Sequence, residues 1–168
     1  MTSATHASPR IVERPAQPYI AVRARVTMAT VDTIAHRIPE VLGRVAALGA
    51  KPAGPPFLKY NLIDMARQLE IEAGVPVIDA VAVDGDLING TLPAGRYASY
   101  LHTGSPSTLV QANALLLDWA ADRGLAWDMT PTEAGDRWAC RLESYRTDPR
   151  EQPDTAQWET ALEFKLAD

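Results

Sequence analysis

One short segment of the chain gathers residue types that could bind or act on a small molecule. Residues 138–145 read Trp-Ala-Cys-Arg-Leu-Glu-Ser-Tyr, and the alternation of polar and apolar side chains predicts a strand. Glu143 and Tyr145 then share one face with Arg141. A carboxylate beside aromatic rings in a partly dry site is costly unless it is paired, and a cationic ligand would pair it. Glu143 is therefore the first candidate for ligand binding.

An ordinary explanation for Glu143 stays open at this point. It could be a solvated strand glutamate that pairs with Arg141 or Arg23. We expect the Glu143 face to line a groove and the opposite, more apolar face to pack under a helix. That opposite face consists of Trp138, Cys140, Leu142 and Ser144. Nothing near Cys140 indicates an activated thiolate, so we expect this residue to be buried and inert.

Aromatic residues supply the other candidates. Tyr60 ends a segment that follows one predicted helix, as Tyr145 ends a segment that follows another, so the two phenols could face each other across a groove. Tyr97 and Tyr100 fall on opposite faces of one strand, so at most one of them faces a ligand. Trp119 lies on an apolar helix stripe; such residues are more often core than ligand contacts, but we keep it as a candidate.

Two amphipathic helices stand out in the hydrophobic pattern. They cover residues 31–48 and 107–123, and glycines at 49 and 124 end them. We expect Pro39 to open the longer part of the first helix after a short turn. Six strands are expected, over residues 19–27, 57–62, 68–77, 96–103, 138–145 and 158–166. In two of them charged residues alternate with the apolar ones: Arg23 and Arg25 in the first, Glu70 and Glu72 in the third.

The element order repeats itself along the chain. Strand, helix, strand, strand occurs over about residues 19–78 and again over 96–166. We therefore predict an α+β fold, built as a tandem repeat of strand-helix-strand-strand units with pseudo-twofold symmetry and a central ligand cleft. Interfaces between such units are a common place for ligand pockets.

Composition narrows the class of protein. The net charge is −5 and the basic residues are scattered, so we expect no direct contact with nucleic acid. A single cysteine fits a reducing compartment, and no apolar run is long enough to span a bilayer, so we expect a cytoplasmic protein without membrane contact. We expect residues 1–10 to be a flexible tail and 11–168 to form one domain. No metal-ligand spacing or nucleotide-binding motif is present, so no cofactor is expected.

Four stretches together resemble a known family, the GyrI-like small-molecule-binding domains that serve as effector-binding domains of AraC-type and MerR-type transcription regulators. They are Leu-Pro-Ala-Gly-Arg-Tyr-Ala-Ser-Tyr-Leu-His-Thr-Gly (92–104), Pro-Ala-Gly-Pro-Pro-Phe-Leu-Lys-Tyr (52–60), Leu-Glu-Ser-Tyr-Arg-Thr-Asp-Pro (142–149) and Trp-Glu-Thr-Ala-Leu-Glu-Phe (158–164). The resemblance covers about residues 12–166. It implies the tandem-repeat fold, a bacterial origin, and multidrug binding linked to transcription regulation.

The same resemblance implies a site. The family binds lipophilic, often cationic compounds between the halves through a glutamate and several aromatic rings, which points to Glu143 here. Some stand-alone members resemble hydrolases that open cyclopropane rings of DNA-alkylating natural products. One departure is Pro106, which stands where many members have an aromatic residue at the start of the second helix, so a pocket wall is expected to differ in shape.

Three functions follow as hypotheses. The first is a sensor or sequestering protein for a small lipophilic molecule; about 18 residues precede the first strand, too few for a helix-turn-helix domain, so it would need a partner regulator. The second is a hydrolase in which Glu143 activates water and Tyr60 or Tyr145 stabilises the developing negative charge. The third is a protein-interaction role like that of a gyrase inhibitor.

Overall fold

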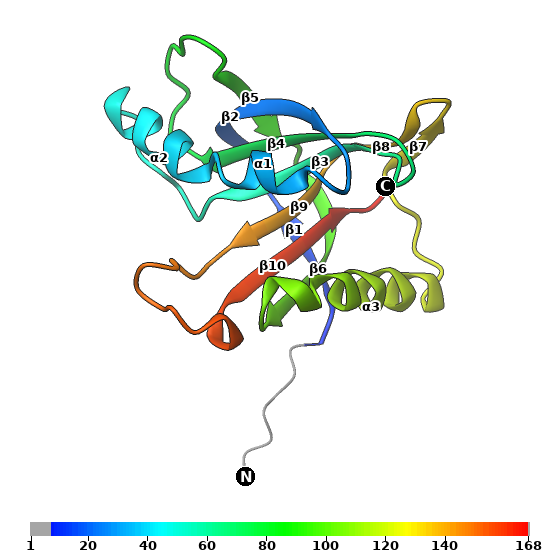
Figure 1. The fold of residues 1–168 in the computed structure, drawn as a ribbon. Helices are drawn as coiled ribbons and strands as arrows, with labels where there is room; N and C mark the ends of the chain where they lie inside the picture. Colours follow the sequence, from blue (N-terminus) through cyan, green and yellow to red (C-terminus); the bar gives the residue numbers. More distant parts are fainter. Residues whose placement is uncertain (1–7, 168) are drawn as a thin grey trace.

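The computed structural model describes residues 8–167, and it shows an α+β fold with one curled antiparallel sheet and helices on one side of it (Figure 1). The strand order is β1-β6-β10-β9-β3-β4-β2-β5, and a β7–β8 hairpin pairs with β3 through β8. The strands are β1 (Arg10–Arg14), β2 (Gln17–Val26), β3 (Phe57–Ile63), β4 (Leu69–Pro76), β5 (Ile88–Leu92), β6 (Gly95–Thr103), β7 (Met129–Thr132), β8 (Gly135–Trp138), β9 (Arg141–Tyr145) and β10 (Glu159–Lys165). The helices are α1 (Val31–Ala35), α2 (Ile38–Ala47), α3 (Leu109–Asp122) and the 3-10 turns η1 (Pro106–Thr108) and η2 (Thr155–Gln157).

The predicted tandem repeat is confirmed. The first unit is β2, α1 with α2, β3 and β4, and the second is β6, α3, β9 and β10. The two units meet where β3 pairs with β9 in the middle of the sheet. In Figure 1, β9 runs between the helices α1 and α2 of the first unit and the helix α3 of the second. The seam between the units therefore lies along β3 and β9.

The first predicted helix is divided in two. α1 ends at Ala35, and α2 begins at Ile38 with Pro39 in its first turn. Proline lacks an N–H, and in the first turn that donor has no intrahelical partner to lose, so the break falls directly before it. The second helix also begins later than expected, because Ser105 caps the separate turn η1 before α3 starts.

Four strands were not predicted from the sequence: β1, β5, β7 and β8. They are four or five residues long and each has at most one buried residue, so they lack the regular apolar alternation that marked the others. Most of the tail predicted over residues 1–10 lies outside the described residues, and Arg10 itself belongs to β1.

Each helix layer covers its own hydrophobic core. α1 and α2 pack on a core that includes Val22, Ile71 and Leu58, and α3 packs on one that includes Leu162 and Phe164. A third cluster, around Tyr97 and Phe57, lies on the face of the sheet away from the helices. The side of the sheet that faces the helices is therefore split into two cores, with β9 at their border.

One face assignment made from the sequence is wrong. Cys140 and Leu142 do not pack under a helix; they belong to the cluster on the opposite face, while Trp138 belongs to the core that α3 covers. The alternation does not continue through the segment, because β8 ends at Trp138 and β9 begins only at Arg141. Cys140 is fully buried, and burial raises the pKa of its thiol to about 11, which disfavours the reactive thiolate.

Candidate functional site

Glu143 lies at the border of the two helix-covered cores. Its cross-strand neighbours are Leu58 of β3, which belongs to the core under α1 and α2, and Leu162 of β10, which belongs to the core under α3. Directly opposite residues of an antiparallel pair share a face, so all three side chains point to the helix side of the sheet. The carboxylate is 8% exposed although both its neighbours are leucines. The fold therefore places a buried carboxylate on the seam between the two units.

Two phenols donate to this carboxylate. The hydroxyl of Tyr145 lies 2.7 Å from Oε1 of Glu143, and that of Tyr60, on β3, lies 3.2 Å from the same oxygen. Burial, and next the negative charge of Glu143, raise the pKa of both phenols well above the usual value. Both therefore remain protonated donors at neutral pH. We define the tyrosine–glutamate cluster as Glu143, Tyr60 and Tyr145.

The second oxygen of Glu143 has no such partner. Among residues 8–167 no side chain or backbone group donates a hydrogen bond to Oε2, and no Lys or Arg forms an ion pair with the carboxylate. Arg23, one partner considered from the sequence, pairs with Glu72 at 3.7 Å on the other face of the sheet. A carboxylate with two neutral donors on one oxygen and no donor on the other can accept a hydrogen bond from outside the chain.

Arg141, the other partner considered from the sequence, lies beside the cluster without pairing with it. Its guanidinium lies over the rings of Trp138 and Phe164, at 4.7 and 4.3 Å from their centroids. Its Nη2 donates to Oδ1 of Asn113 on α3 at 3.1 Å. Burial lowers the pKa of Arg141 to about 10, and the neighbouring Tyr60 and Glu143 oppose that shift. The guanidinium therefore remains charged at neutral pH.

The structure places the two tyrosines of β6 on different faces. Tyr100 pairs with Leu162, which itself pairs with Glu143, so these three side chains form one row on the helix side. Tyr97 is buried in the cluster on the opposite face, where its hydroxyl donates to the carbonyl of Pro93 at 2.6 Å. Of this pair, Tyr100 is the one that shares a face with the tyrosine–glutamate cluster.

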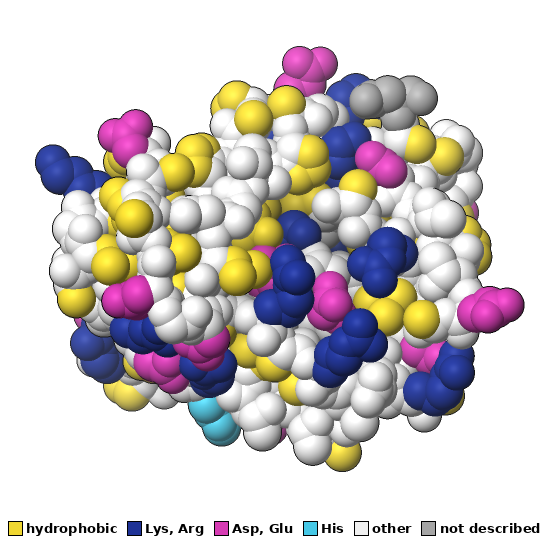
Figure 2. Space-filling view, turned by 90° about the horizontal axis from the view of Figure 1, so that it is seen from above, with side chains coloured by type: hydrophobic (Ala, Val, Ile, Leu, Met, Phe, Trp, Pro, Cys, Tyr) yellow, Lys and Arg dark blue, Asp and Glu magenta, His cyan; other side chains and the backbone are white. Residues whose placement is uncertain are grey.

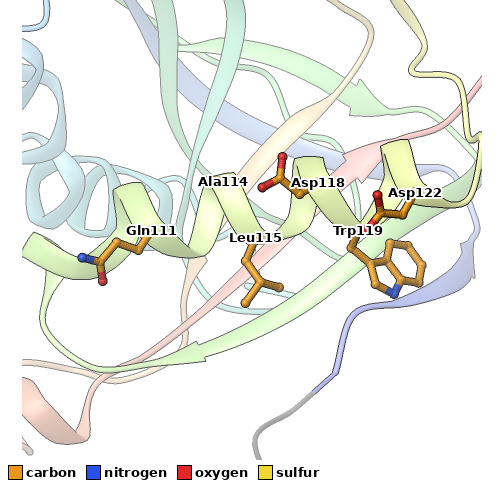
Figure 3. Close-up of a pocket in the computed structure, with 6 residues that line it drawn as sticks. All are labelled: Gln111, Ala114, Leu115, Asp118, Trp119 and Asp122. Atoms are coloured by element: carbon orange, nitrogen blue, oxygen red, sulfur yellow. The ribbon is translucent and has the colours of Figure 1, made fainter.

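Trp119 lies apart from the cluster. It sits on α3, where the guanidinium of Arg123 lies 4.4 Å from its ring centroid. It borders an open hollow of about 560 Å³ on the outer surface of the helix, together with Leu115 and Asp118 (Figure 3). Trp119 therefore lies at the outer surface of the second unit and not at the seam.

A second polar cluster, which the sequence analysis missed, lies on the face away from the helices and is buried except for Arg23. Lys59, Glu72 and Arg23 form a row across β3, β4 and β2. Asn61 occupies an irregularity in the register of β3, and its amide donates to Glu72 at 2.5 Å. The hydroxyl of Tyr19 donates to Glu72 at 2.6 Å. We call Lys59, Glu72, Arg23, Asn61 and Tyr19 the far-face network.

The far-face network borders an open hollow of about 530 Å³. Figure 2 shows basic and acidic side chains gathered in and around a depression at the centre of this surface. Neither this hollow nor the one on α3 is bordered by Glu143, Tyr60 or Tyr145. Both differ chemically from the seam, since their acidic groups are either exposed or already paired with cations.

Residues 8–167 give no support for a metal site or for a membrane-spanning helix. No group of three His, Cys, Asp or Glu side chains is arranged to hold a metal ion. None of the described helices combines the length and apolar character needed to cross a bilayer.

Solved structures share this fold. The C-terminal domain of EcmrR matches with a TM-score of 0.78 at 20% identity, covering 96% of this chain and 98% of that one. SAV2435, solved bound to tetraphenylphosphonium, matches with a TM-score of 0.68 at 9% identity over 95% of this chain and 94% of that one. A hydrolase from Listeria innocua matches with a TM-score of 0.59 at 15% identity over 98% and 94%. At these identities the likeness establishes the fold alone.

Comparison at the level of sequence families establishes more than the fold. No curated protein sequence matches the chain significantly. The family described as the GyrI-like small molecule binding domain matches residues 7–166, nearly the whole chain. This match agrees with the resemblance of the four sequence stretches and with the tandem-repeat sheet. The chain therefore belongs to the family of GyrI-like small-molecule-binding domains.

Proposed function

We propose that this protein binds a lipophilic organic molecule with a cationic or hydrogen-bond-donating group at the seam between its two units. The observation that carries the proposal is the state of Glu143: a buried carboxylate held by two neutral phenols, with no protein cation paired to it among residues 8–167. A buried charge without a counter-charge is costly, and a ligand that supplies the counter-charge recovers that cost on binding. The leucines beside Glu143 suit an apolar ligand body.

The tyrosines have a defined part in this proposal. Their hydroxyls hold Oε1 of Glu143, which leaves Oε2 to the ligand, and their rings offer faces to a cationic group. Tyr100, in the same row as Glu143, is a further contact on the side of the second unit. In this arrangement the protein acts as a sensor or as a sequestering protein, and a partner regulator would convert binding into a response.

The test is a binding measurement with lipophilic cations. Tetraphenylphosphonium and a cationic rhodamine ester are titrated against the wild type and Glu143→Gln, with dye fluorescence and the unfolding temperature as readouts. Binding to the folded state raises the unfolding temperature. We expect Glu143→Gln to weaken binding at least about ten-fold, the effect of losing a charge-assisted contact.

Glu133→Gln serves as the control variant. It removes one negative charge from an exposed position in the β7–β8 turn, away from the seam. It should bind as the wild type does. Equal binding by Glu143→Gln and the wild type would show that the ligand site lies elsewhere.

Hydrolysis is the second candidate, because the tyrosine–glutamate cluster pairs a potential base with phenol donors. Glu143 would take a proton from water as the water oxygen bonds to a cyclopropane carbon and a C–C bond of the ring breaks. The electrons of that bond would move to a conjugated ligand carbonyl, and the phenol of Tyr60 or Tyr145, turned from Glu143 to the ligand, would donate to its oxygen. Turnover of a cyclopropane-bearing alkylating compound, followed by chromatography of the products, tests it. Turnover that disappears in Glu143→Gln supports hydrolysis, and binding without turnover leaves the sensor or sequestering role.

A further inference from the structure

Arg141 is held in place beside the tyrosine–glutamate cluster by contacts that leave most of its donors unused. Two aromatic rings lie against the guanidinium, and Asn113 of α3 accepts from one nitrogen. A guanidinium carries five N–H donors in a rigid fork. That single bond is the only one from its side chain to another group within residues 8–167. The fork is therefore fixed in orientation and still able to bind an acceptor.

The charge of Arg141 is also not used in an ion pair within residues 8–167, although the nearby Glu143 and Asp136 favour it electrostatically. It forms no ion pair with a carboxylate of the described chain, and burial disfavours its charged form. The two buried lysines of the described chain, in contrast, are paired: Lys59 with Glu72 and Lys165 with Asp128. Arg141 and Glu143 thus lie near each other on one face, and each has unused hydrogen-bonding capacity.

The spacing of Arg141 and Glu143 along the strand determines which ligands could contact both side chains. They are two positions apart on β9, so their side chains leave the same face about 7 Å apart along the strand. We propose that Arg141 makes the seam selective for dipolar ligands, an inference that rests on the proposed function. Such a ligand presents a donor or cation to Glu143 and a carboxylate or carbonyl oxygen to Arg141. A ligand that carries only positive charge is repelled by Arg141 and gains one contact instead of two.

A pair of dyes tests this selectivity directly. A cationic rhodamine with a free carboxylate and its methyl ester share the same ring system and differ only in the charged acceptor. We expect the wild type to bind the free-carboxylate dye about ten-fold more tightly than the ester, because an arginine–carboxylate contact is charge-assisted. Equal affinities, or a preference for the ester, would overturn the proposal without use of any variant.

Arg141→Met then assigns the preference to the residue. Methionine keeps an unbranched chain against the rings of Trp138 and Phe164 but removes the charge and the donors. We expect the variant to lose the preference for the carboxylate and to bind tetraphenylphosphonium more tightly than the wild type does. Arg10→Met, which removes the same charge from an exposed position of β1, should keep the wild-type preference.

The outcomes separate this inference from the proposed function. If the ester binds and Glu143→Gln abolishes its binding, the proposed function stands; a carboxylate preference that persists in a folded Arg141→Met then overturns only the role of Arg141. If neither dye nor tetraphenylphosphonium binds the wild type, both the proposed function and this inference fail. Near-ultraviolet circular dichroism of each variant establishes that it is folded.

Discussion

Glu72 and Glu143 are both buried carboxylates of the same sheet, and each accepts a hydrogen bond from a tyrosine hydroxyl. They lie on opposite faces: Glu72 in β4 on the far face, Glu143 in β9 on the helix side. Glu72 also has the amide of Asn61 and two cations, Lys59 at 3.6 Å and Arg23 at 3.7 Å. Among the described residues, Glu143 has only the phenols of Tyr145 and Tyr60 as hydrogen-bond partners of its side chain.

This difference separates a carboxylate that the fold neutralises from one that the proposed ligand would neutralise. The protein neutralises Glu72 with its own cations, so the far-face network is complete without a ligand. It also depends on close packing: a Cβ at Gly90 of β5 would overlap the ring of Tyr19, so only glycine leaves room for the phenol there. Within residues 8–167 the cluster at Glu143 lacks that internal neutralisation, and this contrast supports the ligand site that we propose there.

The largest expected effect comes from matched glutamine substitutions. Glu72→Gln leaves Lys59 and Arg23 without their counter-charge, and breaking a buried ion pair in this way costs about 3–5 kcal/mol of the free energy of unfolding. Glu143→Gln breaks no ion pair of residues 8–167, and the new amide oxygen still accepts from the phenols, so we expect a change below about 1 kcal/mol. Urea unfolding of both variants provides the measurement.

A double variant keeps this comparison informative if Glu72→Gln fails to fold. Lys59→Met combined with Glu72→Gln removes the buried cation together with its partner, so part of the lost stability should return. Equal losses for Glu72→Gln and Glu143→Gln would mean that Glu143 is as structural as Glu72, and the proposed function would lose its main support.

A smaller effect is expected from Asn61, the residue at the register irregularity of β3. Its amide group donates to Glu72 and, at 3.3 Å, to Glu70, and its carbonyl oxygen accepts from Lys59 at 2.5 Å. Asn61→Ala removes these contacts but keeps the Lys59–Glu72 ion pair, so we expect a loss of about 1–3 kcal/mol. Ligand binding at the seam should be unchanged in this variant, since its contacts lie on the far face. Weaker binding would contradict the separation of the two faces.

The sequence predicted the two carboxylate sites unequally. Glu143 stood out because alternation, neighbouring aromatic residues and the family resemblance pointed to the same short segment. The far-face network did not, although the alternation correctly put Arg23 and Glu72 on the polar faces of their strands. Its assembly depends on which strands pair and in which register, and on the irregularity at Asn61. The residue spacing along one segment predicts neither the strand pairing and its register nor such an irregularity.

The same limit explains the errors within the second unit. The alternation around Cys140 and Leu142 was clear, but which face the helices cover is decided by the pairing of β9 with β3 and β10. Short, exposed strands such as β1 and β8 gain their place from the longer strands beside them. Local sequence pattern therefore predicted the repeat and the long elements, and long-range pairing determined the rest.

The smallest expected effect is the alkaline pH dependence of the tyrosine contacts. Tyr145 near Glu143 and Tyr19 near Glu72 both have a pKa raised above the ordinary value of 10, through burial first and the adjacent carboxylate second. The folded protein thus keeps these protons where the unfolded chain releases them. Their contribution to stability is complete below pH 10 and falls as the pH rises above it, by at most about 1.4 kcal/mol per pH unit for each phenol.

Phenylalanine substitutions show how much of the stability lost above pH 10 comes from Tyr145 and how much from Tyr19. Tyr145→Phe and Tyr19→Phe should each be about 1 kcal/mol less stable at pH 7, through the lost hydrogen bond, and each should lose stability less steeply than the wild type above pH 10. Urea unfolding between pH 7 and 11 measures both quantities, and the curves should run parallel below pH 9. A slope unchanged by Tyr145→Phe but reduced by Tyr19→Phe would mean that Glu143 does not hold the proton on Tyr145. The negative charge that a cationic ligand is proposed to meet at the seam would then be in question, while the far-face network would remain as described.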